Sequence, residues 1–352
     1  MESKKTKGFF LVKNGPSTSA FESKSFPLRA LKNDEVLIDS EAFGLNFADV
    51  MARKGLYREA PPLPCILGYE LVGVIQEIGS DVPQSFIGKR VLAFSRFGGY
   101  ARHVITSFNA VAIIGDAPFH EIMALGTQGA TAYYMAQHMI NLHQGERVLI
   151  HAAAGGVGSL LIQLAKRNGA IVYAKIGNEE KQEVVKSLGA DFVIVNKSNN
   201  YDDQLRQLLK NEKLDVIFNP SSGSTYKKDL ALLGAGGKLI LFGAAELASA
   251  KWGIFSKLNF IRKMGFSPPI GLMMTSKSVL GVNMLKIADD KPEVLAKCMT
   301  EMIKKYELKE ITSNKFQVFN ETELAAAHDL LASGKSTGKL IIQWDKLFKN
   351  FQ

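Results

Sequence analysis

A glycine-rich stretch in the middle of the chain has the spacing of a phosphate-binding loop. It reads His151-Ala-Ala-Ala-Gly-Gly-Val-Gly, follows a short apolar run and opens a helical run. Alanine and two glycines take the three glycine positions of the G-x-G-x-x-G pattern. Such small residues let the backbone approach a pyrophosphate closely, and the free N–H groups at the start of the following helix bind its negative charge. The alternative is an ordinary tight turn between a strand and a helix. The residues expected to hold the pyrophosphate are Ala153, Gly155, Gly156, Val157 and Gly158.

The end of the next apolar run indicates which nicotinamide nucleotide fits. It closes with Gly177 and Asn178, where an NAD-binding chain would carry a carboxylate for the ribose 2′-hydroxyl. The first acid is Glu179, while Lys181 lies just beyond and Lys197 follows the third apolar run. Cations without a carboxylate fit a 2′-phosphate, so the sequence predicts NADPH as cofactor, with Asn178, Lys181 and Lys197 in contact with it. The alternative is that both lysines are merely solvated.

Metal-binding spacing is missing from the sequence. Cys65 and Cys298 are the two cysteines, and the six histidines are dispersed, with His138 and His143 off a common helical face. We therefore expect no metal. Hydride transfer to a quinone or a conjugated enone needs none, because charge spreads onto an oxygen that hydrogen-bond donors can hold.

Two kinds of element position these residues. Runs at 35–43, 70–78, 90–94 and 100–105 read as short strands separated by turns, which predicts a barrel or a sandwich. From residue 127 strands alternate with helices, which predicts an α/β region with a parallel sheet covered on both faces. The six expected strands are 147–151, 171–176, 191–195, 215–219, 238–242 and 278–283. Helices near 292–306 and 322–333 and a strand at 338–343 are expected to return to the first domain.

Further motifs recur in order along nearly the whole chain. They include Gly44-Leu-Asn-Phe-Ala-Asp, Arg53-Lys-Gly-Leu-Tyr, Leu67-Gly-Tyr-Glu, Gly129-Ala-Thr-Ala-Tyr-Tyr, the glycine-rich loop, Gly236-Gly-Lys-Leu and Gly334-Lys-Ser-Thr-Gly-Lys. As a set they resemble the zinc-free quinone oxidoreductase branch of the medium-chain dehydrogenase/reductase superfamily. The stretch that begins Phe242-Gly-Ala-Ala-Glu-Leu is most similar to the vesicle amine transport protein subgroup.

This resemblance implies an architecture. Residues 1–126 and 284–352 would form a chaperonin-10-like β-barrel catalytic domain, and residues 127–283 a Rossmann domain with a doubly wound parallel sheet. The active site would lie in the cleft between them. Members of the family usually form homodimers by pairing the last Rossmann strand, here near 278–283.

The resemblance also implies site residues. Zinc-containing relatives place a cysteine ligand where this chain has Asn46 and a histidine where it has Tyr69. Asn46 and Tyr57, which both stand in the matching motifs, are the leading candidates for orienting substrate or nicotinamide, and Tyr69 would line the cleft in place of the histidine. Turn chemistry for Asn46 and a half-buried core ring for Tyr57 are the alternatives. The positions that would line the cofactor are Thr131, Gly177, Lys181, Phe242, Gly243, Val282 and Asn283.

The function predicted from these residues is NADPH-dependent reduction of quinones or α,β-unsaturated carbonyl compounds by hydride transfer. Residues 244–277 combine aromatic and cationic side chains, among them Trp252 and Lys257. We expect a lid over the substrate; the alternative is a membrane-surface patch. The second reading makes the chain a peripheral membrane or lipid-handling protein that binds NADPH with little catalysis.

Composition excludes several classes of protein. The 352 residues are 46% hydrophobic, enough for two domains, and contain no run of eighteen apolar residues. A formal charge of +9 is spread over scattered lysines, so nucleic-acid binding is not expected, although the positive field helps to attract an anionic dinucleotide. The amino-terminal stretch lacks the pattern of a signal peptide, and with two cysteines a cytoplasmic location is expected.

Overall fold

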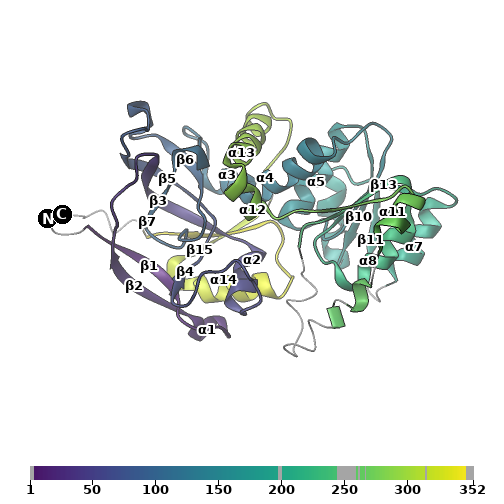
Figure 1. The fold of residues 1–352 in the computed structure, drawn as a ribbon, viewed down its shortest axis with the longest axis horizontal. Coiled ribbons are helices and arrows are strands. Elements are labelled where there is room, and N and C mark those ends of the chain that lie inside the picture. The colour runs from purple at the N-terminus through teal and green to yellow at the C-terminus, as the bar shows by residue number, and fades with distance from the viewer. Residues whose placement is uncertain are drawn as a thin grey trace. The chain divides into compact units, whose positions relative to one another are not determined.

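The computed structural model describes residues 4–196, 200–243, 259–260, 262–265, 267–313 and 315–345. The chain divides into two compact units, Met1–Ala130 with Leu285–Gln352, and Thr131–Met284 (Figure 1). The sequence places these boundaries after residues 126 and 283. Lys197 and residues 244–258 lie outside the described residues.

The second unit contains a six-stranded sheet in the part of the chain that the structure describes. Its order is β11-β10-β9-β12-β13-β14, and each neighbouring pair is parallel. The strands are β9 (Arg147–Ile150), β10 (Ile171–Ile176), β11 (Phe192–Val195), β12 (Leu214–Asn219), β13 (Leu233–Leu241) and β14 (Ser278–Gly281). The strand order reverses between β9 and β12, so the sheet is doubly wound.

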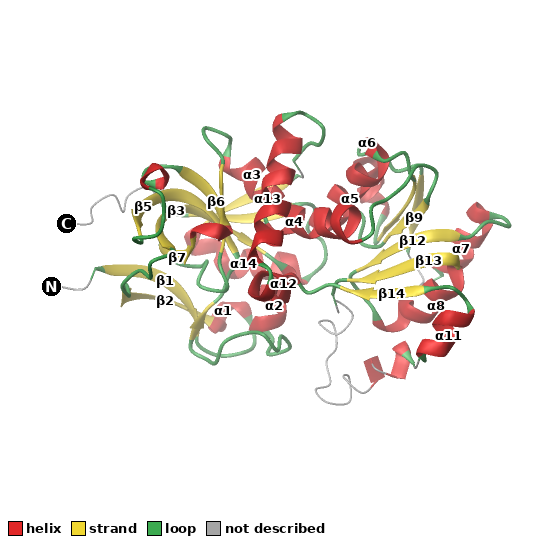
Figure 2. Ribbon diagram, turned by 45° about the horizontal axis from the view of Figure 1, so that its top comes forward, coloured by secondary structure: helices red, strands yellow, loops and turns green. Residues whose placement is uncertain are grey.

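Helices cover both faces of this sheet (Figure 2). They are α5 (Gly156–Arg167), α6 (Gln182–Ser187), α7 (Tyr201–Leu209), α8 (Tyr226–Leu232) and α11 (Pro269–Met274), with short 3-10 helices at Glu179–Lys181 and Gly223–Thr225. Leu205, Leu209 and Leu232 of α7 and α8 pack with Leu149 and Ile217 of the strands in one apolar core. Helix α4 (Thr127–Tyr133) continues into a π-helical segment, Tyr134–Met139.

The first unit is built from both ends of the chain (Figure 1). One sheet has the order β15-β16-β3-β5-β6-β8, with β7 paired to β3, and a smaller sheet has the order β2-β1-β4. Strand β16 runs antiparallel to β3, with Leu340 opposite Leu45, so the final strand completes a sheet that residues before position 130 begin.

The elements of this unit have the following bounds. The strands are β1 (Lys5–Leu11), β2 (Phe21–Pro27), β3 (Glu35–Leu45), β4 (Cys65–Ile66), β5 (Glu70–Ile78), β6 (Arg90–Phe94), β7 (His103–Ser107), β8 (Val111–Ile113), β15 (Phe316–Asn320) and β16 (Lys339–Gln343). The helices are α1 (Ser17–Ala20), α2 (Phe47–Arg53), α3 (Phe119–Leu125), α12 (Met284–Asp290), α13 (Pro292–Glu307) and α14 (Leu324–Ala332), with 3-10 turns at Gln84–Phe86, Phe108–Ala110 and Glu321–Glu323.

The predicted fold class is confirmed: a doubly wound parallel sheet accompanies a mainly antiparallel β unit. Strands β5, β6 and β10 have the bounds that the sequence predicted. Strands β1, β2 and β15 were not among the expected elements. Lys5 and Lys7 obscure the apolar pattern of β1, and β2 and β15 are mostly exposed, so the two-residue alternation of a half-buried strand is not evident.

Candidate functional site

The residues expected to bind the cofactor gather at one edge of the parallel sheet. In such a sheet the carboxyl ends of all strands meet at the same edge. The glycine-rich loop follows β9, and Gly177 with Asn178 follows β10. Residues Phe242–Gly243 and Val282–Asn283 follow β13 and β14, and Thr131 lies in α4 of the same unit.

The loop after β9 has the shape that a diphosphate requires. Ala152 adopts a left-handed conformation with φ 49°, and its carbonyl accepts a hydrogen bond from the Gly155 amide at 2.8 Å. The amide of Ala153 donates to the carbonyl of Lys175 at 3.0 Å, which ties the loop to β10. A Cβ on Gly158 would lie 2.5 Å from the Ala152 carbonyl oxygen, so this position accepts only glycine. The first turn of α5 therefore presents its amides beside a close backbone approach.

Two asparagines at this edge carry buried acceptors that lack a partner. The Oδ1 atoms of Asn178, after β10, and Asn196, after β11, are buried and have no hydrogen-bond partner among the described residues. A Cβ on Gly177 would meet open space, so the backbone there is accessible. Ribose hydroxyl groups can donate to such amide oxygens, and buried polar atoms are normally satisfied. The cradle around Gly158 and these two orphaned oxygens fit an adenosine dinucleotide.

Lys181 is half-buried, and burial lowers the pKa of its ammonium below its ordinary value. It lies in the 3-10 turn that follows Asn178. A cation whose charged form is disfavoured by burial gains from a nearby anion. Lys197, the other lysine expected to meet a 2′-phosphate, lies outside the described residues.

In the first unit, the start of α2 fixes the backbone around Asn46. Asn46 is the N-cap of this helix, and its amide donates to the Asp49 carboxylate at 2.8 Å. The other oxygen of Asp49 accepts from the Gly68 amide at 3.3 Å. Because Gly68 precedes Tyr69, one buried carboxylate holds both segments that carry predicted catalytic residues.

The side chain of Asn46 belongs to a buried polar cluster with Glu70 and Lys339. Its Nδ2 donates to Glu70 Oε1 at 2.8 Å, and its Oδ1 accepts from Lys339 Nζ at 3.0 Å. Lys339 also forms an ion pair with Glu70, and both side chains are fully buried. Gly44 and Gly126 wall this cluster: a Cβ on Gly44 would lie 2.6 Å from Lys339 Cε, and one on Gly126 would lie 2.1 Å from Glu70 Oε2.

Tyr69 presents a buried phenol beside that of Tyr57. The residue is 3% exposed, and its hydroxyl forms no hydrogen bond of ordinary geometry among the described residues, while it interacts with the Tyr57 phenol. Its ring packs against Phe97 and Phe94, with centroids 5.1 Å and 6.4 Å away. Burial raises the pKa of Tyr69 far above its ordinary value, and Asp49 and the neighbouring Tyr57 phenol act in the same direction. The phenol is therefore a hydrogen-bond donor that keeps its proton.

Tyr57 and Asp49 are two further titratable groups near this phenol. Burial raises the pKa of Tyr57, which is half-buried, to about 12. Burial also raises the pKa of Asp49 to about 7, against the opposing effect of the Asn46 amide hydrogen bond. The structure thus brings Asn46, Tyr57 and Tyr69 together around Asp49.

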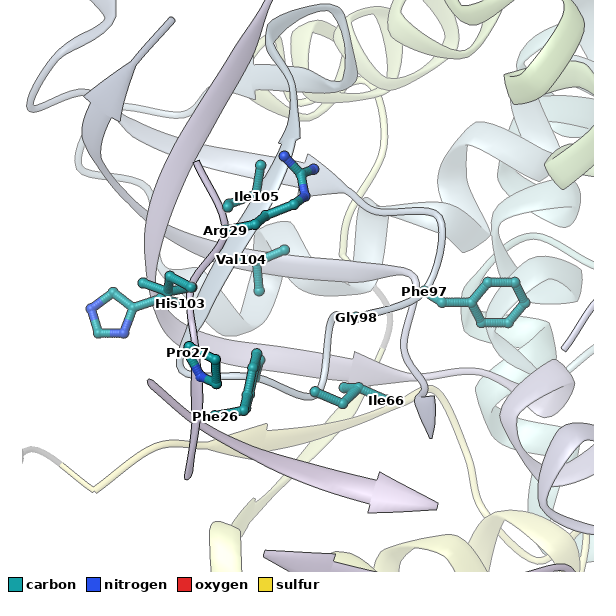
Figure 3. A pocket seen from close by; sticks show the side chains of 11 residues that line it. Phe26, Pro27, Arg29, Ile66, Phe97, Gly98, His103, Val104 and Ile105 are labelled. Carbon is teal, nitrogen blue, oxygen red and sulfur yellow. The ribbon is translucent and has the colours of Figure 1, made fainter. Parts of the chain in front are cut away.

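A cavity of about 280 Å³ lies elsewhere in the first unit, between β2 and β7 (Figure 3). Its lining is mainly apolar, and the Phe97 ring points away from it. Its two titratable side chains have protein partners: Arg29 donates to Glu35 at 2.8 Å, and the His103 ring lies 3.0 Å from the Thr6 hydroxyl. We assign no function to this cavity.

Sequence reasoning missed several residues of these two groups. Glu70 is the last residue of the Leu67-Gly-Tyr-Glu motif. Its ion pair with Lys339 joins residues 269 positions apart, so the sequence around either residue gives no sign of it. Asn196 follows an apolar strand just as Asn178 does, and that shared position was the available signal. Within the described residues no group of three or more His, Cys, Asp or Glu side chains could hold a metal ion. No helix in the described ranges is long and apolar enough to cross a membrane.

A doubly wound parallel sheet with a glycine-rich loop at its carboxyl edge, in one chain with a mainly antiparallel β unit, is typical of nucleotide-dependent oxidoreductases. Two family models match in these regions. The model "Alcohol dehydrogenase GroES-like domain" matches residues 32–146, and "Zinc-binding dehydrogenase" matches residues 156–301.

Similar proteins narrow the class. The chain is 30% identical over 315 residues to a synaptic vesicle membrane protein VAT-1 homolog of Danio rerio, which covers 89% of this chain and 65% of that protein. It is 28% identical to a quinone oxidoreductase of Rattus norvegicus, covering 89% and 90%. A crystal structure of Escherichia coli quinone oxidoreductase complexed with NADPH has 25% identity and a TM-score of 0.83, and the match covers 96% of this chain and 99% of that one. The chain belongs to the medium-chain dehydrogenase/reductase superfamily, in the quinone oxidoreductase branch that includes VAT-1-like proteins.

Proposed function

We propose that this protein uses NADPH to reduce quinones or α,β-unsaturated carbonyl compounds without zinc. The observation that carries the proposal is the buried hydroxyl of Tyr69, which forms no hydrogen bond of ordinary geometry among the described residues and interacts with the Tyr57 phenol beside it. An unsatisfied buried donor costs about 1–3 kcal/mol. A carbonyl oxygen of the substrate would satisfy it.

Tyr69 would then act on the charge that develops during reduction. When hydride reaches the acceptor carbon, negative charge moves onto the substrate oxygen, and a fixed donor stabilises it. The raised pKa of Tyr69 keeps the phenol protonated, so it donates a hydrogen bond and retains its own proton. Its aromatic neighbours hold the ring in place and exclude water.

Asn46 would position this part of the site. Lys339 and Glu70 bind the two ends of its carboxamide and so fix its orientation. An amide nitrogen carries two hydrogens, and the bond to Glu70 uses one of them. The second hydrogen remains as a donor for substrate or nicotinamide.

Zinc does not fit the residues at this position. The oxygens of Asn46 and Glu70 already bind the Lys339 ammonium, and Tyr69 is a phenol whose pKa lies far above neutrality. Zinc ligands are normally thiolates, imidazoles and carboxylates that are free to approach the ion. The buried ammonium supplies the positive charge here instead. Without a Lewis acid, the acceptor must be activated by its own conjugation, which favours quinones and enones.

The second unit would hold NADPH, which supplies the hydride when bound. The amides around Gly155 and Gly158 would bind its diphosphate, and Asn178 its ribose. Lys181 and Lys197 would meet the 2′-phosphate. Two observations support NADPH over NADH: Asn178 stands where a ribose-binding carboxylate would be expected, and the similar Escherichia coli enzyme is described as complexed with NADPH.

The test is NADPH oxidation by the purified chain with a panel of quinones and enones, compared with NADH and with saturated ketones. We expect turnover with NADPH and the conjugated acceptors and little with saturated ketones. Turnover of simple alcohols or ketones that depends on stoichiometric zinc would contradict the proposal. Absence of binding to both nucleotides would end it.

We also propose that the protein is a homodimer in the cytoplasm with no nucleic-acid partner. Strand β14 stands at the end of the strand order and pairs with β13 alone among the described strands. Helix α11 directly precedes β14 and exposes Met273 and Met274 at 69% and 79%. An edge strand beside apolar side chains is suited to pairing with a second copy. Half of the residues in 244–277, for which the sequence suggested a lid or a membrane-surface patch, lie outside the described ranges.

A further inference from the structure

Five polar side chains are buried together in the second unit beneath the glycine-rich loop. They are His151, Lys175, Tyr201, Asn219 and Asp229, each at most 9% exposed. They come from the end of β9, from β10, α7, the end of β12 and α8. Charged groups are rarely buried to this degree unless they are paired.

Asp229 is the hub of this cluster. One of its oxygens accepts from the Tyr201 hydroxyl at 2.7 Å and lies 3.0 Å from His151 Nε2, and the other accepts from Asn219 Nδ2 at 2.6 Å. Lys175 Nζ lies 3.2 Å from His151 Nδ1 and 4.0 Å from the centre of the Tyr201 ring. The cluster therefore contains one buried cation and one buried anion bridged by an imidazole.

The protonation of the imidazole follows from its neighbours. Burial lowers the pKa of His151, so the ring is neutral near pH 7. The tautomer that satisfies both neighbours carries its proton on Nε2, donates it to Asp229 and accepts from the Lys175 ammonium through Nδ1. Burial raises the pKa of Tyr201 well above its ordinary value, so the phenol remains a neutral donor.

Lys175 reaches the loop in two ways. Its side chain contacts His151, the first residue of the loop, and its carbonyl accepts the amide of Ala153 two residues further on. We propose that Lys175 is a positioning residue for the dinucleotide loop and that its buried ammonium makes cofactor affinity fall as pH rises. The inference rests on the proposed binding of NADPH at this loop.

The direction of the pH effect follows from linkage. Burial lowers the pKa of Lys175 to about 8, and Asp229 opposes that change. The other charges facing this lysine are Lys228 and Asp202, which pair with each other at 2.7 Å. A diphosphate beside the loop favours the charged form of Lys175, so binding takes up a proton near pH 8. Affinity is then full below about pH 8 and decreases above it.

Calorimetric titration of the full chain with NADPH tests this between about pH 6.5 and pH 9.5, spanning the titration of Lys175. In the wild type we expect about a tenfold loss of affinity across this range, as for a pKa change of one unit. Parallel titrations near pH 8.5, in two buffers of different ionisation enthalpy, should show proton uptake.

Three variants identify the responsible group. K175M should bind about tenfold more weakly at neutral pH and show no further fall at higher pH. K175R keeps a charge that does not titrate in this range, so its affinity should stay constant. K181M is the matched control: it should weaken binding through the 2′-phosphate while the decline at high pH remains.

A pH-independent affinity with no proton uptake in the wild type would overturn the inference, even if the variants failed to fold. A decline in K175M equal to that of the wild type would also overturn it, as would loss of the decline in K181M. Failure of the wild type to bind NADPH or NADH at any pH would instead defeat the proposed function.

Discussion

Lys339 and Glu70 stand 269 residues apart in the chain and form an ion pair whose side chains are 0% and 1% exposed. Removing one partner of a buried pair leaves a charge without compensation. We expect Lys339→Met to lower the free energy of unfolding by about 3–5 kcal/mol. Urea unfolding followed by circular dichroism measures the change.

The double variant Glu70→Gln with Lys339→Met is the control for this pair. It removes both charges, so it should be more stable than Lys339→Met alone. A double variant that is no more stable than the single one would show that the cost does not come from the uncompensated carboxylate.

Tyr69→Phe removes the hydroxyl and keeps the ring against Phe97 and Phe94. Loss of a donor that meets developing charge typically lowers kcat by about 10²–10³-fold. We expect a loss in this range with a quinone and NADPH, without a loss of thermal stability. Tyr57→Phe, on the half-buried neighbour, should cost less. A Tyr69→Phe enzyme with wild-type kcat would remove this residue from the mechanism.

Asp49 should make stability depend on pH. Its pKa in the folded chain is raised to about 7, above the roughly 3.9 of an unfolded aspartate. The folded state thus binds the proton more tightly, so this contribution to stability is full below about pH 4 and is lost as pH rises towards 7. The unfolding free energy of the wild type minus that of Asp49→Asn should decrease as the pH is raised from 4 to 8, because only the wild type loses this contribution. A constant difference would argue against a titrating Asp49.

Comparing Gly158→Ala with Gly177→Ala distinguishes an effect on the packing of the glycine-rich loop from an effect on cofactor binding alone. A Cβ at 158 would lie 2.5 Å from the Ala152 carbonyl oxygen, whereas one at 177 meets open space. We expect Gly158→Ala to lose about 1–3 kcal/mol of stability through overpacking and to weaken NADPH binding. Gly177→Ala should leave the melting temperature unchanged and affect binding alone. Equal stability of the two variants would contradict the close approach at Gly158.

Met273→Asp with Met274→Asp tests the exposed face of α11. If the exposed face of α11 is buried when two copies pair through β14, the double variant would bury two charges at the contact. Light scattering should then show a monomer for the variant and a dimer for the wild type. A monomeric wild-type chain would contradict the dimer, and flotation with anionic liposomes that is lost on substitution would favour a membrane-surface patch instead.

The elements that the sequence predicted well are those in which burial imposes a simple pattern. Strand β10 is buried along nearly its whole length, and the loop after β9 combines glycine spacing with a helix start. Strand β15 escaped prediction because Phe316 and Val318 are partly exposed and the strand pairs only with β16 in the described sheet. Its position depends on pairing with β16, which the local sequence of β15 does not indicate.

The candidate site divides in the same way. The residues of the glycine-rich loop were predicted from spacing, and Asn46, Tyr57 and Tyr69 from family resemblance. The contacts that fix Asn46 were beyond reach, because Lys339 approaches from the far end of the chain. The buried cluster of His151, Lys175 and Asp229 was also missed, because a polar residue inside an apolar run gives no sign of its partners.

The pairing of β16 with β3 has a consequence for biosynthesis. While the chain emerges from the ribosome, β3 and Glu70 have no contact with Lys339 until residue 339 has been made. The second unit is continuous in sequence and can reach its folded state earlier. Premature termination before residue 339 would therefore leave a nascent chain with a folded second unit and an incomplete β sheet, a species that chaperones and proteases recognise.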